Sequence, residues 1–164
     1  MIVGIYGTGR FGSFWASALA RHAEVRTYNR SERPVPARCA GVSLEELGRC
    51  DAVMLCVAIN AVYAALDALV GHLAPGTVVM DTCSVKVHPI RSMLAAVPEA
   101  NPVIGTHPMF GPDSAGVGLD GLPMVLSPAR AEEAVVGRWE RFFASTGLRL
   151  LRMSPDEHDR EAAM

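Results

Sequence analysis

Runs of consecutive apolar residues alternate with longer, helix-compatible segments in the first half of the chain. The strands expected at 1–6, 52–59 and 77–81 are apolar at successive positions, which indicates burial on both faces, as in a parallel sheet. The segments 13–22 and 61–72 are rich in alanine and have the length of helices. This alternation predicts an α/β fold, a doubly wound domain with a mostly parallel sheet.

A glycine-rich turn with the sequence Gly7-Thr8-Gly9-Arg10-Phe11-Gly12 joins the first strand to the first helix. The first glycine of such a turn allows the tight bend, the second lets a pyrophosphate approach the backbone, and the third lets the helix pack closely on the strand. The amides at the helix N-terminus then face the phosphates. Because the turn lies between the strand and the helix that this mechanism requires, it predicts a dinucleotide cofactor in a Rossmann-type domain.

The end of the second strand, Val25–Tyr28, indicates which dinucleotide binds. An acidic residue at this position, about 20 residues beyond the glycines, would accept hydrogen bonds from ribose hydroxyls. Here the chain has Asn29-Arg30-Ser31, which offers a guanidinium and two polar side chains to a phosphate. The sequence therefore favours NADP, with NAD as the alternative if Arg30 is a solvated loop residue. Whether Arg33 or Arg38 assists stays open, because prolines make this loop hard to place.

Ligands of doubly wound sheets bind beyond the carboxyl ends of the strands. Asp81 is expected there to hold its loop through hydrogen bonds to backbone amides, and Lys86 to face solvent or to neutralise a nearby charge. By the same rule, four further residues are assigned to the cofactor site: Val57, Ala58, Asn60 and Cys83.

The second half of the chain is expected to complete the same sheet. A loop rich in Gly and Pro, rather than a helix, leads to the strand expected at 124–127, so that strand is a candidate for an antiparallel neighbour. The predicted elements are a helix from Pro89 to about Val97, strands at 103–105, 124–127 and 148–153, and a helix at 131–146 that Gly147 ends.

Ser154-Pro155-Asp156-Glu157 has the features of a helix start, with serine as N-cap, proline at the first helical position and two acids in the first turn. The chain reaches Met164 barely two turns later. We therefore expect a dinucleotide-binding domain at 1–153, followed at 154–164 by the first turns of a truncated C-terminal helical domain.

Composition and charge exclude several classes of function. The 164 residues have a net charge of −2 and no cluster of Lys and Arg, so nucleic acid is not an expected partner. No apolar run has membrane-spanning length, and the N-terminus lacks the basic region and cleavage site of a signal peptide. No His, Cys, Asp and Glu set has metal-ligand spacing, so no metal is expected. Four cysteines without a C-x-x-C pair are expected to be reduced in a cytoplasmic protein: Cys39, Cys50, Cys56 and Cys83.

Three segments resemble the prephenate/arogenate dehydrogenase family: the turn at 7–12, Asp81-Thr82-Cys83-Ser84-Val85-Lys86, and Gly105-Thr106-His107-Pro108-Met109-Phe110-Gly111-Pro112. The run His158-Asp159-Arg160 also resembles the start of this family's second domain. The resemblance covers nearly the whole chain but only the cofactor-binding half of the family. It implies an all-helical C-terminal domain beyond Met164, which forms the dimer and completes the substrate pocket.

The resemblance implies an NAD(P)-dependent oxidative decarboxylation of prephenate or arogenate in tyrosine biosynthesis. In this reaction a hydride leaves the carbon that bears the ring hydroxyl, and the ring carboxylate departs as carbon dioxide. By resemblance, His107 is the catalytic histidine, and Ser84 helps to orient the histidine and the substrate. On physical grounds alone, an imidazole suits a general base near neutral pH, whereas a surface histidine and a turn serine are the alternatives.

The expected partners are a small-molecule substrate and a second copy in a homodimer, with no membrane contact. Two other functions remain open from the sequence. The chain is alternatively a different NADP-dependent dehydrogenase or reductase, of the β-hydroxyacid dehydrogenase or imine reductase type, or a non-catalytic NADP-binding module. The isolated chain is expected to lack full activity, because the helical domain is missing from it.

Overall fold

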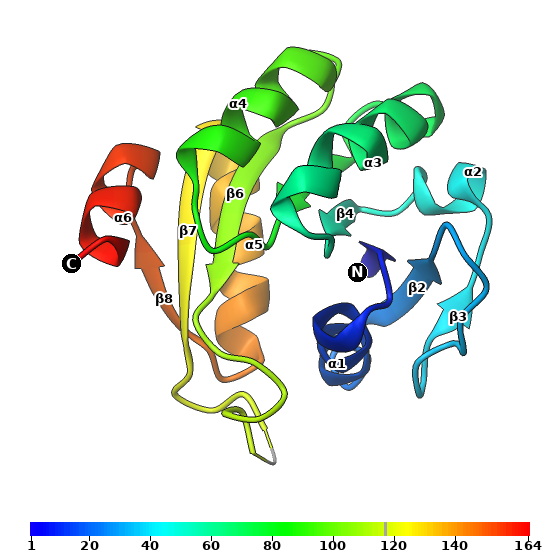
Figure 1. Ribbon diagram of the computed structural model, residues 1–164, viewed down its shortest axis with the longest axis horizontal. Coiled ribbons are helices and arrows are strands. Elements are labelled where there is room, and N and C mark those ends of the chain that lie inside the picture. Colours follow the sequence, from blue (N-terminus) through cyan, green and yellow to red (C-terminus); the bar gives the residue numbers. More distant parts are fainter. Residues whose placement is uncertain (117) are drawn as a thin grey trace.

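The computed structural model describes residues 1–116 and 118–164, and within them one sheet of eight strands forms the centre of the molecule (Figure 1). The strands are β1 (Ile2–Tyr6), β2 (Glu24–Tyr28), β3 (Ala40–Gly41), β4 (Ala52–Leu55), β5 (Val78–Asp81), β6 (Val103–Pro108), β7 (Pro123–Arg130) and β8 (Arg149–Arg152). The helices are α1 (Arg10–Leu19), α2 (Leu44–Leu47), α3 (Val62–Leu69), α4 (Val87–Ala96), α5 (Glu133–Ser145) and α6 (Pro155–Ala162), with 3-10 turns η1 (Ile59–Ala61) and η2 (Val70–His72).

The strand order is β3-β2-β1-β4-β5-β6-β7-β8, so the chain runs outward from β1 to β3 and then crosses to β4 on the other side of β1. Neighbouring strands are parallel except β6 and β7, which are antiparallel. The predicted doubly wound, mostly parallel Rossmann-type fold is therefore confirmed, as is the antiparallel direction of β7. In such a sheet the crevice for a ligand lies at the switch point, here between β1 and β4.

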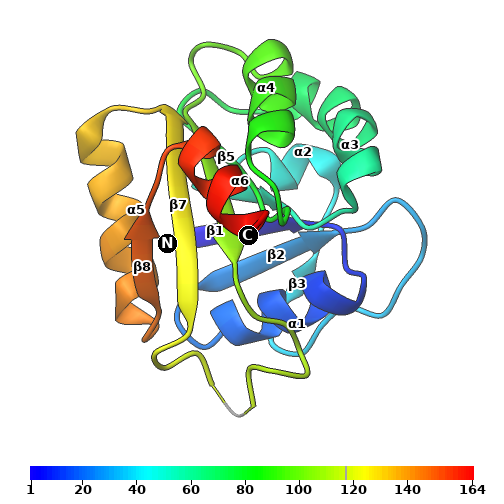
Figure 2. The ribbon, with the colours of Figure 1, turned by 60° about the vertical axis from the view of Figure 1, so that its left-hand side comes forward.

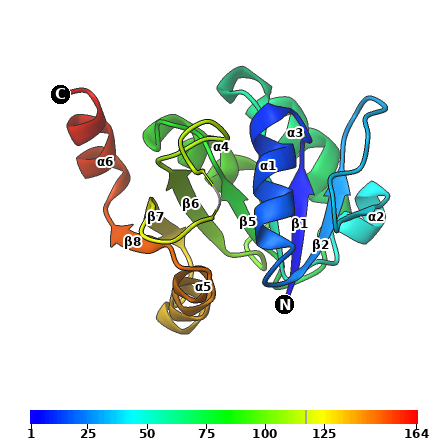
Figure 3. The same cartoon turned by 90° about the horizontal axis from the view of Figure 1, so that it is seen from below.

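Helices cover both faces of the sheet, with α3 and α4 on one side and α1 on the other (Figure 2). Trp15 and Leu19 of α1 are fully buried in the same core as Trp139 and Phe143 of α5. The opposite core contains Leu66 and its neighbours from α3 and α4. Burial of one such side chain stabilises the fold by about 1.5–3 kcal/mol. The shorter helices α2 and α6 lie at opposite ends of the molecule (Figure 3). Within the described ranges, no helix is long and apolar enough to cross a membrane.

Two strand boundaries differ from the prediction in ways that matter for the site. The strand expected to reach residue 59 ends at Leu55, level with its paired neighbours Tyr6 and Asp81. The strand expected to end at residue 105 continues to Pro108, because β7 pairs with it along its whole length. His107 therefore lies in a strand and not in the loop that follows it.

Helix starts are close to their predicted positions. Helix α4 begins at Val87, two residues before the expected Pro89. Pro89 thus lies in the first turn of the helix. Proline is tolerated there because the amides of the first turn have no hydrogen-bond acceptor within the helix. The predicted start at Ser154 is confirmed, with a reciprocal capping box between Ser154 and Glu157. Gly147 follows α5 with a φ of +97°, as expected of a helix-ending glycine. Strand β3 was not predicted, because two residues are too few for a periodic pattern.

A buried ion pair joins the end of β5 to the start of α4. The Asp81 carboxylate accepts hydrogen bonds from the Lys86 ammonium and from the amides of Cys83 (3.0 Å) and Thr106 (3.2 Å). Lys86 also donates to the Thr106 carbonyl at 2.6 Å. Burial raises the pKa of Asp81, and Lys86 and the two amides oppose this effect. The predicted bonds from Asp81 to backbone amides are confirmed. The solvent-facing alternative for Lys86 is wrong, because its side chain is 0% exposed and neutralises Asp81.

We expect Lys86→Ala to lower the free energy of unfolding by about 3–5 kcal/mol, because it leaves the Asp81 charge buried without its partner. Urea denaturation measures the loss. The control is Arg49→Ala, which breaks an exposed pair with Glu45 and should cost less than about 1 kcal/mol. The double variant Lys86→Met/Asp81→Leu should recover most of the stability. Equal losses for the two single variants would show that the buried pair is not a structural clamp.

Candidate active site

The three glycines of the turn have distinct surroundings. Gly7 has a φ of +99°, and a Cβ atom there would lie 2.6 Å from the carbonyl oxygen of Cys56. A Cβ on Gly12 would lie 1.9 Å from the Gly7 oxygen, so α1 packs directly against the turn. A Cβ on Gly9 would meet no atom of the described chain within 4 Å. The turn is therefore tight at its first glycine, closely packed at its third and open at its second, as a bound pyrophosphate requires.

The N-terminus of α1 is suited to an anion. Within the described residues it has no side-chain cap and no acid in its first turn. Its first backbone hydrogen bond runs from Ser13 to Gly9, so the preceding amides have no helical acceptor. The Arg10 side chain pairs with Asp113 at 2.6 Å, and the Phe11 ring packs on other aromatic rings of α1. These two predicted cofactor residues can thus act through their backbone amides.

Asn29 ties the loop after β2 to the glycine turn. Its side-chain oxygen accepts a hydrogen bond from the Thr8 amide at 3.0 Å. Its side-chain nitrogen donates to the carbonyl and the hydroxyl of Ser31, at 2.7 and 3.1 Å. Arg30 lies between Asn29 and Ser31 in the sequence. Burial raises the pKa of the Tyr6 phenol, and the nearby charge of Arg30 acts in the opposite direction. The loop therefore holds Arg30 near the glycine turn, and both line one cavity.

A cavity of about 370 Å³ lies between the glycine turn, the loop after β2 and α3. Its wall brings together seven of the predicted cofactor residues: Gly7, Gly9, Asn29, Arg30, Ser31, Val57 and Ala58. Among the described residues, six others that were predicted for the cofactor lie outside this wall: Thr8, Arg10, Phe11, Gly12, Asn60 and Cys83. Thr8 and Gly12 still stabilise the turn. The Thr8 amide donates to Asn29, and Gly12 packs against the backbone of Gly7.

The wall also contains residues that were not assigned from the sequence. Arg33 lines it together with Arg30, whereas Arg38 is not among the residues of this wall. Small side chains of η1 and α3 leave room for the cavity. They recur at helical spacing, a signal that the sequence does contain: Ala61, Ala64, Ala65 and Ala68.

His107 of β6 hydrogen-bonds a second histidine, which comes from α6. The Nδ1 atom of His107 lies 2.9 Å from Nε2 of His158, whose own Nδ1 lies 2.8 Å from Oδ1 of Asp159. The Asp159 carboxylate also accepts the backbone amides of Lys86 at 2.6 Å and Val87 at 2.9 Å. Hydrogen bonds through His158 and Asp159 therefore link β6, α6 and the start of α4. This chain of contacts was not predicted. The sequence had singled out His158 and Asp159 only through the family resemblance, which gave no contact between them and His107.

The charges in this chain of contacts follow from burial and hydrogen bonding. Burial lowers the pKa of His107 to about 4, with His158 and Lys86 acting in the same direction and Asp159 against it. His107 is therefore neutral at pH 7 and can accept a proton. Burial would raise the pKa of Asp159, but hydrogen bonds from the Val87 amide, His158 and the Lys86 amide hold it below its usual range.

Ser84 is an exposed residue between β5 and α4, at the same edge of the sheet as His107. The part of the chain that the structure describes offers its hydroxyl no hydrogen-bond partner. The neighbouring Cys83 is buried, and burial, together with the charge of Asp81, raises the pKa of its thiol to about 12. Cys83 is therefore a protonated thiol and not a nucleophile. In residues 1–116 and 118–164, no group of three His, Cys, Asp or Glu side chains is placed to hold a metal ion.

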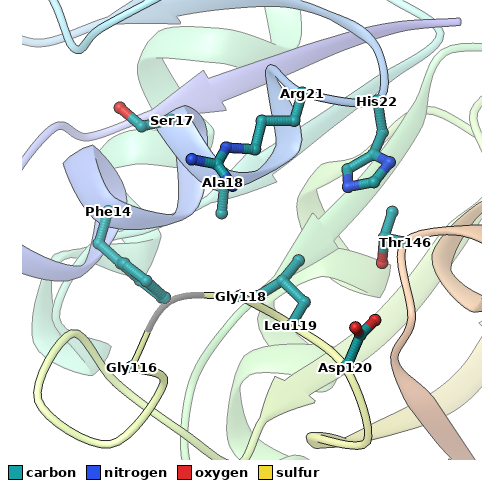
Figure 4. A pocket seen from close by; sticks show the side chains of 10 residues that line it. All are labelled: Phe14, Ser17, Ala18, Arg21, His22, Gly116, Gly118, Leu119, Asp120 and Thr146. Atoms are coloured by element: carbon teal, nitrogen blue, oxygen red, sulfur yellow. The ribbon is translucent and has the colours of Figure 1, made fainter.

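A larger cavity, of about 480 Å³, lies away from these residues (Figure 4). It is bounded by Phe14 of α1, by Arg21 just after that helix, and by Leu119 and Asp120 of the loop before β7. None of the predicted site residues lines it. Size alone therefore does not identify the site, and the smaller cavity at the switch point is the better candidate because the open turn faces it.

A doubly wound sheet with an open glycine turn at its switch point is the architecture of a dinucleotide-binding domain. Comparison with known proteins assigns the chain further. The family profile described as "Prephenate dehydrogenase, nucleotide-binding domain" matches residues 23–151. The chain belongs to this family of prephenate and arogenate dehydrogenases, which are oxidoreductases.

Relatives and solved structures agree with this assignment. Arogenate dehydrogenase 1, chloroplastic, of Arabidopsis thaliana is 32% identical over 174 residues, which cover 98% of this chain and 27% of that protein. Arogenate dehydrogenase from Synechocystis has the same fold, with a TM-score of 0.83 at 23% identity, over 99% of this chain and 63% of that one. Prephenate dehydrogenase from A. aeolicus, solved with hydroxyphenyl propionate and NAD+, gives a TM-score of 0.76 at 21% identity, over 97% and 62%. The chain thus spans less than two thirds of each of them.

We expect acid to destabilise the fold through His107. An unfolded histidine has a pKa of about 6.5, whereas that of folded His107 is about 4. Between these values the unfolded chain binds a proton that the folded chain does not, so the stability falls as the pH drops from about 6.5 to about 4. Thermal unfolding across this range should show a larger loss for the wild type than for His107→Gln. The control His88→Gln removes an exposed histidine of α4 and should behave as the wild type. Identical pH profiles for all three would contradict the burial of His107.

Proposed function

We propose that this chain is the nucleotide-binding domain of an NADP-dependent enzyme that oxidatively decarboxylates prephenate or arogenate in tyrosine biosynthesis. The observation that carries the proposal is His107, a neutral imidazole held by His158 at the edge of the sheet where the glycine turn lies. The activity named for the Arabidopsis relative supports this reaction class. The proposal includes a helical domain that begins at α6, completes the substrate pocket and forms a homodimer in the cytoplasm.

The residues around the turn fit a dinucleotide. Open space at Gly9 and the free amides of α1 suit a pyrophosphate, and the cavity beside them has room for the adjoining nucleoside. The Val57-Ala58 stretch after β4 lines the same cavity and is placed to contact the nucleoside. The bound nicotinamide would supply the hydride acceptor of the reaction.

Two cations favour the phosphorylated form of the dinucleotide. Arg30 and Arg33 both line the cavity at the end of β2, and they are the charged members of its described wall. Asn29 occupies the place where an acid would bind the ribose hydroxyls. The nearest acid in this loop, Glu32, lines an adjoining hollow of about 220 Å³ instead. Guanidinium groups bind phosphate through paired, charge-assisted hydrogen bonds, so this wall suits NADP better than NAD.

His107 supplies the base that the reaction needs. Its free ring nitrogen would accept the proton of the substrate hydroxyl, while the carbon that bears this hydroxyl would lose its hydride to the nicotinamide and become a carbonyl. Loss of carbon dioxide then leaves an electron pair that makes the ring aromatic and turns the carbonyl into a phenolate. His107 returns the proton to that oxygen, so the histidine is regenerated. Ser84, which is exposed in the stretch after β5, would hydrogen-bond the substrate at the same edge.

Turnover tests the proposal. The chain, and a longer version from the same gene if one is encoded, would be mixed with prephenate or arogenate and NADP, and reduced cofactor would be followed by absorbance. We expect a version that contains the helical domain to be active on one of the two substrates. His107→Asn should lower its turnover by about 10²–10⁴-fold and leave cofactor affinity unchanged. The proposal fails if the longer version is inactive on both, and an equal loss of turnover and affinity would make His107 structural.

Arg30→Ala should weaken NADP by roughly 10- to 100-fold and NAD by much less, because it removes a charge-assisted hydrogen bond to the extra phosphate. Fluorescence titration of the chain with each dinucleotide measures this difference. Arg21→Ala is the matched control, since Arg21 lines the other cavity and should affect neither cofactor. Equal weakening of NADP and NAD by Arg30→Ala would show that Arg30 does not read the phosphate.

A further inference from the structure

His158 and Asp159 are placed to decide which nitrogen of His107 carries a proton. His158 is 3% exposed, so its ring nitrogens find their partners inside the protein. Those partners are His107 at 2.9 Å and Asp159 at 2.8 Å. The Asp159 carboxylate is itself fixed by the amides of Lys86 and Val87 at the start of α4. The donor and acceptor roles along this chain are therefore coupled from one end to the other.

The roles follow in order from the carboxylate. An ionised carboxylate only accepts hydrogen bonds, so Nδ1 of His158 must donate to Asp159. A neutral imidazole has one donor and one acceptor, so Nε2 of His158 accepts. Nδ1 of His107 must then donate to it. The remaining nitrogen of His107, Nε2, is left without a proton, on a ring that is only partly buried.

We propose that His158 and Asp159 are positioning residues for His107, which hold its Nε2 unprotonated towards the substrate and take up its Nδ1 proton during the reaction. This inference rests on the proposed function for its chemical meaning. As the substrate O–H bond breaks, an Nε2–H bond forms on His107, its Nδ1–H bond breaks, and an Nε2–H bond forms on His158. The positive charge then lies on His158 beside the Asp159 carboxylate. The reverse transfer accompanies protonation of the product.

The environment of His107 explains why such a relay would help. Burial, His158 and Lys86 all lower the pKa of His107, so this imidazole alone is a weak base. His158 differs because a carboxylate lies 2.8 Å away. The chain of contacts gives the incoming charge a paired site one residue further from the substrate.

A purely structural role for His158 is the alternative. Asp159 also caps α4, and α6 packs against α4, so loss of these contacts would loosen the fold whatever the histidines do. A structural role predicts lower stability without a change in the proton position on His107. A readout of the ring protons therefore separates the two roles.

The test measures histidine tautomers by long-range 1H–15N spectroscopy of the 15N-labelled chain at neutral pH. The wild type should show His107 protonated at Nδ1 and bare at Nε2. His158→Phe removes the acceptor and should raise the Nε2-protonated share of His107 about fivefold. His158→Gln keeps an acceptor oxygen and should restore the wild-type pattern, and it also serves if the Phe variant does not fold. His88→Phe, in an exposed histidine, is the control. A wild-type His107 protonated at Nε2, or no change in His158→Phe, overturns the proposal.

Kinetics in a version active on prephenate or arogenate add a second readout. His158→Phe should lower kcat about tenfold or more with little change in the KM for the cofactor, and His158→Gln should recover part of the loss. Equal changes in both constants would contradict a positioning role. If the tautomers behave as expected but no version turns over either substrate, the proposed function fails while the control of His107 by His158 stands. If turnover is found without the tautomer shift, the positioning role alone fails.

Discussion

The buried pair of Lys86 and Asp81 is the constraint on which the carboxyl end of the sheet depends. It joins β5, β6 and α4 through the backbone of Thr106, the residue before His107. Two charges withdrawn from water repay their desolvation only when their geometry is kept, so the pair contributes little net stability but strongly disfavours other arrangements. The amides at the start of α4 that hold Asp159 lie directly beside it. The ion pair thus fixes the orientation of His107 in two ways: through the backbone of Thr106, and through the α4 amides that hold Asp159.

The site has two halves of different character. The glycine turn and the start of α1 offer mainly backbone groups, whereas the histidine end is made of side chains held in a hydrogen-bonded chain. The two halves are linked across the sheet, because the loop after β6 brings Phe110 onto the rings of Phe14 and Trp15 in α1. The helix that would face the phosphates and the strand that carries His107 are thereby parts of one packed unit.

The parts of this structure that the sequence predicts are those whose cause is local. Positive φ at Gly7, the cap at Ser154 and the polar stretch after β2 each follow from a few adjacent residues. The hydrogen bond between His107 and His158 joins residues 51 positions apart, and no local pattern records it. The burial of Lys86 likewise depends on a carboxylate from another element. The sequence left solvent exposure and charge neutralisation both open for Lys86, and the fold decides between them by burying it against Asp81.

The short length of β8 has a consequence for how the chain can vary. This strand ends at Arg152, which pairs with Leu126, the partner of Thr106 in β6. The connection to α6 therefore leaves the sheet almost level with His107, and the helix presents His158 to it within a few residues. One residue inserted between β8 and α6 would rotate the helix by about 100° about its axis and carry His158 away from β6. Surface connections usually tolerate insertions and deletions, but this one has a fixed length, set by the phase of a helix relative to a single imidazole.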